Sequence, residues 1–229
     1  MSDAMLYTPS GCVLYLDLRK ANGNKVYDYS GSGNHGTIYG AKLNQELPCR
    51  GLEFDGVDDY VEVPNNDALN PVEAVSVEAV ICLHEEVRLK AIVSKYDYDQ
   101  YRLYIGDYGA TAFSLTTASG HRGCIGLSEY KLEAGKWYHL CGLYDGSEIL
   151  VYRDASLICS VSHNGNIITS TYDVQIGRRN HPEEEWYLPA TILLVRVYNR
   201  ALSSDEVKKC FEDIQKRILR RIVAARDVS

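Results

Sequence analysis

Acidic residues are concentrated in one short stretch of the chain, GLEFDGVDDYVEVP, which runs from Gly51 to Pro64. The carboxylates in this stretch are Glu53, Asp55, Asp58, Asp59 and Glu62. Carboxylates at this density indicate a metal site, an acid/base pair, or the solvent side of a turn. Apolar residues alternate on both sides of the Asp-Gly pair, which is typical of two strands joined by a hairpin turn. We therefore expect the aspartates to lie in the turn, with Glu53, Tyr60 and Glu62 facing outward and no catalytic residue or metal ligand among them.

Aromatic and polar side chains that could bind a sugar occur in three segments. A ring can stack on the apolar face of a sugar while polar groups bond its hydroxyls. The segments are KYDYDQYR (95–102), the predicted turn SGHRG (119–123) and RRNHPEEEW (178–186). The candidate ligand-binding residues in them are Tyr96, Tyr98, Tyr101, His121, Arg122, Arg178, Asn180 and Trp186. The alternative is that a chain with 18 tyrosines exposes many of them and that Trp186 is a packing residue.

A pair of catalytic carboxylates is not apparent in the sequence. Glycoside hydrolysis takes two carboxyl groups, which an E-x-D-x-x-E or E-x-x-x-E array within one strand would supply. The predicted strands contain no such array. The glutamates at 183–185 are consecutive and follow a proline, so they would not share one face of a strand. The sequence also lacks a GxSxG nucleophile motif. A hydrolase or lyase is therefore the least favoured function.

The charge and hydropathy of the chain narrow the class of partner. The formal net charge is −7, which argues against nucleic acid as the main partner. No run of 18 apolar residues occurs, so no membrane span is expected. The N-terminal residues lack the basic and apolar regions of a secretory signal, which favours a cytoplasmic or virion-associated location without deciding it.

The seven cysteines show no CxxC motif and no paired Cys/His spacing, which argues against a zinc framework. Their odd number leaves at least one thiol free or bonded to another chain. We expect most of them to be small core residues. Abundant tyrosine and rare glutamine favour a heat-adapted source, where intracellular disulfides occur, so the cysteines do not define the compartment.

Short apolar segments recur at close intervals along most of the chain. After a glycine-rich loop at 21–40, they show no alternation with helices, so a parallel α/β fold is not expected. The predicted strands are 12–18, 52–54, 60–63, 75–83, 91–95, 101–106, 112–117, 124–128, 137–145, 148–154, 156–162, 173–177 and 190–198. This pattern predicts an all-β sandwich of antiparallel strands over residues 1–202.

The segment 203–229 has a helical pattern instead. Ser203 and Glu206 form a capping box, which marks the start of a helix. Apolar residues then recur at steps of three and four, at Val207, Phe211, Ile214, Ile218, Ile222 and Ala225. This amphipathic helix would either dock on the chain's own sheet or pair with a second copy through residues 203–226. The second outcome would favour a structural or virion-surface assembly protein.

Six short motifs in the same order resemble the laminin-G-like, concanavalin A-like jelly-roll domains, in particular a pentraxin-related branch with bacterial, archaeal and viral members. The motifs are YDYSGSGNHGTIYG (27–40), GLEFDGVDDYVEVP (51–64), VSVEAVICL (75–83), KWYHLCGLYDGSEILVYRD (136–154), VQIGRR (174–179) and LLVRVYNRALSSDEV (193–207). The resemblance covers about residues 11–209. It implies a two-sheet antiparallel jelly roll with one concave and one convex sheet.

The resemblance implies function only loosely, because this fold supports lectins, adhesion modules, hydrolases, lyases and spacers. Relatives often hold a structural Ca²⁺ with an acidic "IDEV" segment, which here reads Ile192-Leu193-Leu194-Val195. Leucine cannot ligate Ca²⁺, so we expect no cofactor, although Asp28 and Asn34 remain in the glycine-rich loop. The lyases of this fold use Tyr, His, Arg and Gln, a set that Tyr101, His121 and Arg122 match only in part. We expect a non-catalytic carbohydrate-binding, lectin-like adhesion module that binds a glycan or glycoprotein.

Overall fold

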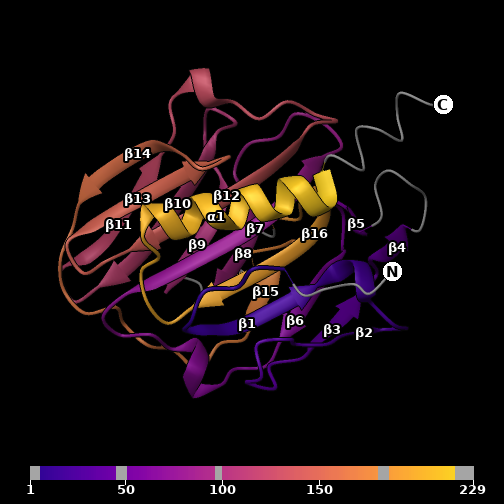
Figure 1. Cartoon of the computed structure of the whole chain (residues 1–229), viewed down its shortest axis with the longest axis horizontal. Helices are drawn as coiled ribbons and strands as arrows, with labels where there is room; N and C mark the ends of the chain where they lie inside the picture. Colours follow the sequence, from indigo (N-terminus) through magenta and orange to yellow (C-terminus); the bar gives the residue numbers. More distant parts are fainter. Residues whose placement is uncertain (1–5, 45–50, 96–99, 180–185, 220–229) are drawn as a thin grey trace.

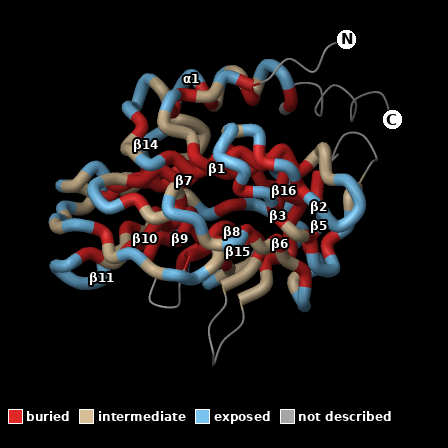
Figure 2. Tube along the Cα trace, turned by 90° about the horizontal axis from the view of Figure 1, so that it is seen from below, coloured by how far each residue is buried: buried red, intermediate tan, exposed pale blue. Residues whose placement is uncertain are grey.

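The fold is described by a computed structural model, which covers residues 6–44, 51–95, 100–179 and 186–219. Two antiparallel eight-stranded sheets form a sandwich, as predicted (Figures 1 and 2). The first sheet runs in the order β14 (Ser156–Ser162), β13 (Glu148–Arg153), β12 (Trp137–Tyr144), β7 (Val75–Leu83), β16 (Pro189–Tyr198), β5 (Gly51–Asp55) and β4 (Lys42–Asn44), with β1 (Cys12–Asp17) also beside β16. The second runs β11 (Gly120–Ile125), β10 (Thr111–Thr117), β9 (Tyr101–Ile105), β8 (Lys90–Lys95), β15 (Val174–Ile176), β6 (Tyr60–Val63), β3 (Gly36–Tyr39) and β2 (Lys25–Val26).

Alternate residues of each strand enclose the core between the two sheets. In β6, Val61 and Val63 are fully buried while Tyr60 and Glu62 are half-buried on the other side, as the alternation predicts. Strand β7 differs, because all nine of its residues are buried. Its outer side is covered by the C-terminal helix, which forms a third layer over the first sheet (Figure 2).

The stretch from Gly51 to Pro64 is not a hairpin, which corrects the prediction. Strand β5 pairs with β4 and β16 in the first sheet, whereas β6 pairs with β3 and β15 in the second. The segment between β5 and β6 therefore crosses from one sheet to the other. The Asp-Gly pair still forms a turn, with Gly56 at a φ of 82°.

Two further elements depart from the predicted positions. Strand β3 lies inside the stretch expected to be a loop, and it adds Tyr39 to the second sheet. Strand β11 begins at Gly120 rather than Cys124, so His121 and Arg122 lie in a strand and not in a turn. Short 3₁₀ helices occupy Leu18–Lys20, Asp67–Leu69 and Ser128–Tyr130.

The C-terminal helix α1 (Ser204–Ile214) continues into a π-helical turn at Gln215–Leu219. The predicted capping box is present: Ser203 Oγ accepts from Glu206 N at 3.2 Å, and Glu206 Oε2 accepts from Ser203 N at 2.9 Å. The helix lies along the outside of the first sheet (Figure 1). Ile222 and Ala225 of the predicted stripe lie outside the described residues. No helix in the described ranges is long and apolar enough to cross a membrane.

The helix docks on its own sheet through its apolar stripe. Ile214 and Ile218 pack with Val80, Leu193 and Leu194 in one buried cluster, to which Leu6 also belongs. A second buried cluster comprises Cys141, Leu143, Tyr152, Tyr198, Leu202 and Val207. Of the two expected outcomes for the stripe, the structure therefore shows self-docking.

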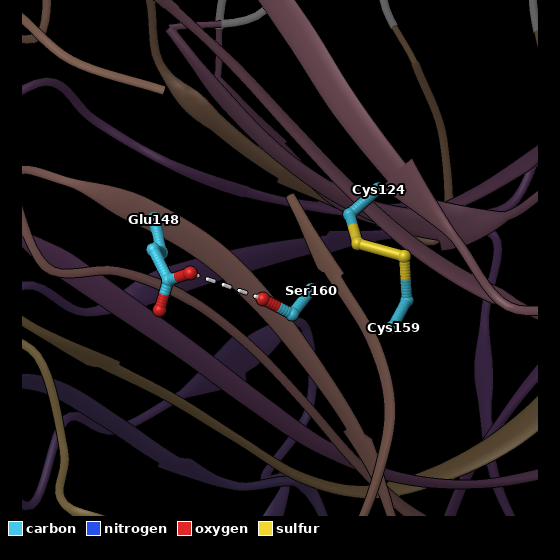
Figure 3. Close-up of a disulfide and its surroundings, with 4 residues drawn as sticks. All are labelled: Cys124, Glu148, Cys159 and Ser160. Carbon is cyan, nitrogen blue, oxygen red and sulfur yellow. Dashed lines mark hydrogen bonds between the residues drawn. A yellow bond between two sulfur atoms is a disulfide. The ribbon is translucent and has the colours of Figure 1, made fainter. Parts of the chain in front are cut away.

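A disulfide joins the two sheets. Cys124 in β11 and Cys159 in β14 form the bond, with their Cα atoms 6.0 Å apart. Figure 3 shows it beside Glu148 of β13, which accepts a hydrogen bond from Ser160 of β14. Since β11 and β14 are edge strands of opposite sheets, the bond closes one side of the sandwich. Cys12, Cys82, Cys141 and Cys210 are free, whereas Cys49 lies outside the described residues.

Candidate functional site

A row of polar residues crosses the outer face of the second sheet from edge to edge. The strand registers align Gly123, Ser114, Arg102, Ser94, Gln175, Glu62, Thr37 and Lys25. Their strand neighbours, such as Val174 and Ile176 beside Gln175, are fully buried in the core. The row is therefore the polar side of a half-buried sheet, and Glu62 is its one carboxylate.

A group of stacked side chains lies next to the row, on β6, β3 and the segment after β15. The rings of Tyr39 and Tyr60 are nearly parallel, at 13°, with centroids 4.5 Å apart. The Arg178 guanidinium lies 3.6 Å from the centroid of the Tyr60 ring. Tyr60 thus has a planar group at each side, whereas Tyr39 is 41% exposed and leaves part of its ring to solvent. We call Tyr39, Tyr60 and Arg178 the tyrosine stack.

A chain of hydrogen bonds fixes the tyrosine stack to the polar row. Gln175 Nε2 donates to Glu62 Oε2 at 2.9 Å, and Gln175 Oε1 accepts from Arg178 Nε at 3.1 Å. Arg178 Nη1 also donates to Tyr187 Oη at 3.4 Å. Since Gln175 is only 4% exposed, these bonds hold Arg178 over Tyr60 in a fixed place. Burial raises the pKa of Tyr60, so its hydroxyl stays neutral at neutral pH.

The centre of the outer face is covered by residues that follow β15. Trp186 is half-buried, and its ring centroid lies 5.1 Å from the Arg102 guanidinium and 4.7 Å from that of Arg179. Arg102 also lies over the ring of Tyr104, at 4.1 Å. Trp186 therefore packs against the protein, as the alternative interpretation of this residue expected. The more open part of the face is its β6–β3–β2 side, where Tyr39 lies.

The structure brings some of the predicted ligand-binding residues together and separates others. Arg178 and Trp186 lie on the same part of the outer face. His121 also faces outward, but four strand spacings separate β11 from β15, or roughly 19 Å. Arg122 has the opposite strand parity and faces away from the polar row. Tyr96, Tyr98 and Asn180 lie outside the described residues.

Tyr101 was predicted to bind a ligand, and the structure corrects this prediction. The structure buries its ring completely between the sheets, and its hydroxyl donates to the carbonyl of Leu69 at 3.2 Å. Burial also raises the pKa of this hydroxyl. The residue begins β9, where it shares the core side with Leu103, so it cannot stack on a ligand.

The sequence did not point to Tyr39 and Gln175 as site residues, although it placed Tyr60 and Glu62 on an outward face. Gln175 lies in a predicted strand, but nothing local shows that it neighbours Glu62, 113 positions away. A signal for Tyr39 was present, since Thr37, Ile38 and Tyr39 form a short run of good strand formers inside the glycine-rich loop.

The aspartates of the opening stretch lie in a hollow of about 700 Å³ that also involves Lys42, Glu53 and His84. Oxygens of Asp55, Asp58 and Asp59 lie within 4.8 Å of one another. Asp55 Oδ1 accepts from Val57 N at 2.8 Å and Asp59 Oδ2 from Asp55 N at 2.9 Å, which confirms the predicted turn chemistry. Burial raises the pKa of Asp59. Three carboxylates are few for Ca²⁺, which takes about six to eight oxygens, so we assign no metal to them.

The glycine-rich loop is organised by Asp28. Its Oδ1 accepts from the amides of Tyr15 and Ser30, at 2.8 and 2.9 Å. Its Oδ2 accepts from the Ser30 hydroxyl and the Asn34 amide, at 2.8 and 2.9 Å. Asn34 Nδ2 in turn donates to the carbonyl of Val13 at 2.7 Å. Both residues that remained as candidate Ca²⁺ ligands are thus engaged within the protein.

A network of charged groups lies on the outer face of the first sheet, beneath α1. Glu78 Oε1 is 2.7 Å from His139 Nε2, and its Oε2 accepts from Arg196 Nη1 at 3.2 Å and Tyr198 Oη at 3.0 Å. Burial alone would raise the pKa of Glu78, but Arg196 and the hydrogen bonds from His139 and Tyr198 outweigh it and lower the pKa to about 2. Glu78, His139 and Arg196 are fully buried, so this network supports the fold.

Comparison with known proteins identifies the superfamily of the chain. A family model described as the concanavalin A-like lectin/glucanases superfamily matches residues 55–208. A comparison with curated protein sequences gives no match.

Several solved structures share the fold. The binding domain of Paraclostridial Mosquitocidal Protein 1 has a TM-score of 0.71 at 15% identity, over 88% of this chain and 52% of that one. The binding domain of botulinum neurotoxin DC in complex with SialylT has a TM-score of 0.70 at 16% identity, over 90% of this chain and 52% of that one. This chain thus spans about half the length of these toxin domains.

A third solved structure is matched over nearly its whole length. Domain 4 of AbnA, a GH43 extracellular arabinanase from Geobacillus stearothermophilus, in complex with arabinotriose, has a TM-score of 0.67 at 16% identity, over 87% of this chain and 97% of that one. At these identities the likeness shows the fold alone. Because the family model covers well over half of the residues, the chain belongs to the concanavalin A-like lectin/glucanases superfamily.

Proposed function

We propose that the chain is a non-catalytic, lectin-like module that binds saccharides on the outer face of the second sheet, at the tyrosine stack. The observation that carries this proposal is the partly open ring of Tyr39 beside a fixed set of hydrogen-bonding groups. Thr37 and Glu62 are cross-strand neighbours, and the pair Tyr39–Tyr60 lies two residues along the same two strands, on the same face. An apolar ring face, a hydroxyl, a carboxylate and a guanidinium thus occupy neighbouring positions on one face of the sheet.

This combination suits a sugar, which has an apolar face of C–H groups and a rim of hydroxyls. The hydrogen bond from Gln175 to Glu62 and the one from Arg178 to Gln175 fix these groups before a ligand arrives, which reduces the entropy lost on binding. Solved neighbours of the same fold support the ligand class, since two of them were determined in complex with SialylT and with arabinotriose.

A binding role is favoured over catalysis because glycoside hydrolysis takes two carboxyl groups. The polar row provides one, Glu62, and its Oε2 accepts a hydrogen bond from Gln175. The buried carboxylate of Glu78 lies on the other sheet, beneath α1, out of reach of a polysaccharide.

A glycan array of neutral and sialylated oligosaccharides would test the proposal. We expect the wild-type chain to bind and Tyr39→Ala to bind about tenfold more weakly, a loss of about 1.4 kcal/mol. Tyr7→Ala is the matched control, since Tyr7 is similarly exposed, at 39%, and its backbone amide bonds Asp213 on the helix side of the molecule. Binding should be unchanged by EDTA, because the proposed site uses side chains and no metal ion. A folded chain that binds no glycan would refute the proposal.

A further inference from the structure

A second hollow, of about 250 Å³, lies at one end of the sandwich. Three connections meet there: 84–89 between β7 and β8, 106–110 between β9 and β10, and 126–136 between β11 and β12. The lining includes Glu86, Arg88, Asp107, Tyr108, Ser128 and Lys131. We call it the rim hollow. None of its lining residues belongs to the polar row or the tyrosine stack.

Backbone hydrogen bonds and one ion pair hold the three connections together. Gly109 N donates to Gly106 O at 3.0 Å, which closes a tight turn with Asp107 and Tyr108 at its tip. Leu132 N donates to Gly109 O at 2.9 Å, and Lys131 Nζ forms an ion pair with Glu86 Oε2 at 2.5 Å. The protein's own contacts therefore fix the walls of the rim hollow.

The lining of the rim hollow is polar but balanced in charge. Glu86 and Asp107 are acidic, whereas Arg88 and Lys131 are basic. Opposite charges in equal number favour a neutral polar ligand over an anion or a cation. In the described part of the chain, the side chains of Arg88 and Asp107 form no hydrogen bond or ion pair, so both are available to hydroxyl groups.

An exposed aromatic ring completes this set. Tyr108 is 58% exposed, the most of any tyrosine in the described ranges, and Val87 adds an apolar side chain to the lining. A ring beside hydroxyl-bonding groups is the combination that takes one face of a sugar. The volume is below the roughly 300–1,000 Å³ typical of pockets for drug-sized ligands, which suits one or two sugar rings.

The backbone beside the rim hollow is strained. Leu89, which follows Arg88, has a φ of 53° and a side chain that is 37% exposed. Left-handed backbone is unfavourable for leucine, and the exposed side chain gains little from burial there. Such strain is often found at binding sites, where the surrounding structure imposes it. It is a second observation, independent of the lining, that indicates a site.

We propose that the rim hollow is a second saccharide site, which takes one or two neutral sugar rings stacked on Tyr108. This proposal rests on the proposed function in one respect, which is that the ligand is a saccharide. It would make the chain bivalent, with one site on the outer face of the second sheet and another at the end of the sandwich.

Titration of the ¹⁵N-labelled chain with arabinotriose, maltotriose and a sialylated lactose, followed by NMR, tests the second site. We expect a neutral trisaccharide to shift the amides of Asp107, Tyr108 and Gly109, as a set with its own dissociation constant, distinct from shifts around Tyr39. Tyr108→Ala should weaken the first set about tenfold and leave the second within twofold. Tyr39→Ala should do the reverse, and Tyr7→Ala should change neither.

The outcomes separate the two proposals. Shifts confined to the surroundings of Tyr39 would overturn the rim site and leave the proposed function standing. Shifts confined to 86–88, 107–109 and 128–131 would support the rim site and refute the tyrosine stack. The absence of shifts with all three probes would refute both. Unchanged shifts in a folded Tyr108→Ala chain would also overturn the rim site.

Discussion

At the scale of single residues, the buried carboxylate of Glu78 is the group whose removal we expect to destabilise the fold most directly. It pairs with Arg196, which is also fully buried, so removing it leaves an uncompensated charge in the interior. We expect Glu78→Ala to lower the free energy of unfolding by about 3–5 kcal/mol, measured by urea titration. Glu129→Ala, which removes an exposed carboxylate, should cost less than about 0.5 kcal/mol.

The double variant Glu78→Leu/Arg196→Leu separates the cost of the unpaired charge from the contribution of the pair. Since both charges are removed together, it should recover most of the loss caused by Glu78→Ala. If the double variant is as unstable as the single one, the cavity left by the side chains, and not the charge, dominates the loss.

The lowered pKa of Glu78 predicts a dependence of stability on pH. The unfolded carboxyl binds a proton near pH 4.5 and the folded one only near pH 2. Its contribution is therefore complete above about pH 4.5 and is lost as the pH falls through 2. The stability advantage of wild type over Glu78→Gln should shrink by about 3 kcal/mol between pH 6 and pH 2, as measured by denaturant unfolding at each pH. If the difference in stability between wild type and Glu78→Gln is the same at pH 6 and pH 2, folding does not lower the pKa of Glu78.

At the scale of elements, the docked helix predicts that its stripe contributes to the stability of the chain. Ile214 is fully buried against Val80, Leu193 and Leu194. We expect Ile214→Ala to lower the free energy of unfolding by about 2–4 kcal/mol, measured by thermal or urea unfolding. Glu212→Ala, on the exposed side of the same helix, should change it by less than about 0.5 kcal/mol. Equal stability of the two variants would mean that the stripe does not dock in solution.

The disulfide between β11 and β14 predicts a second element-scale effect. It closes a loop with a sequence separation of 35 residues and constrains the unfolded chain. We expect the variant Cys124→Ala/Cys159→Ala to lose about 4 kcal/mol of unfolding free energy. Reductant should destabilise the wild type by a similar amount and leave the double variant unchanged. A wild type insensitive to reductant would show that the bond does not form in solution.

The elements themselves were largely predictable from the sequence. Strands such as β7 and β14 match the predicted ranges because apolar alternation is a local property. The capping box at Ser203 is equally local, and the structure contains it. The partner of a strand is not local, and so the Asp-Gly turn was assigned to a hairpin although β5 and β6 belong to different sheets.

The candidate site was less predictable for the same reason. The tyrosine stack joins residues from β3, β6 and the segment after β15, which only the sheet order brings together. Local composition favoured Tyr101 because it lies near other tyrosines, yet strand parity turns its ring into the core. Arg178 is among the predicted ligand-binding residues, but its stacking on Tyr60 depends on the pairing of β15 with β6.

At the scale of the whole molecule, the two ends of the described chain meet on one side. Leu6 packs with Ile214 and Ile218, and Tyr7 N donates to Asp213 at 2.8 Å. This junction lies on the helix layer, whereas the second sheet forms the opposite side of the molecule (Figure 2). A tether at either terminus would therefore display the tyrosine stack away from its support. Chains immobilised on a biosensor through N-terminal or C-terminal tags should bind the same glycan with equal dissociation constants. Loss of glycan binding with one of the two tags would contradict this geometry.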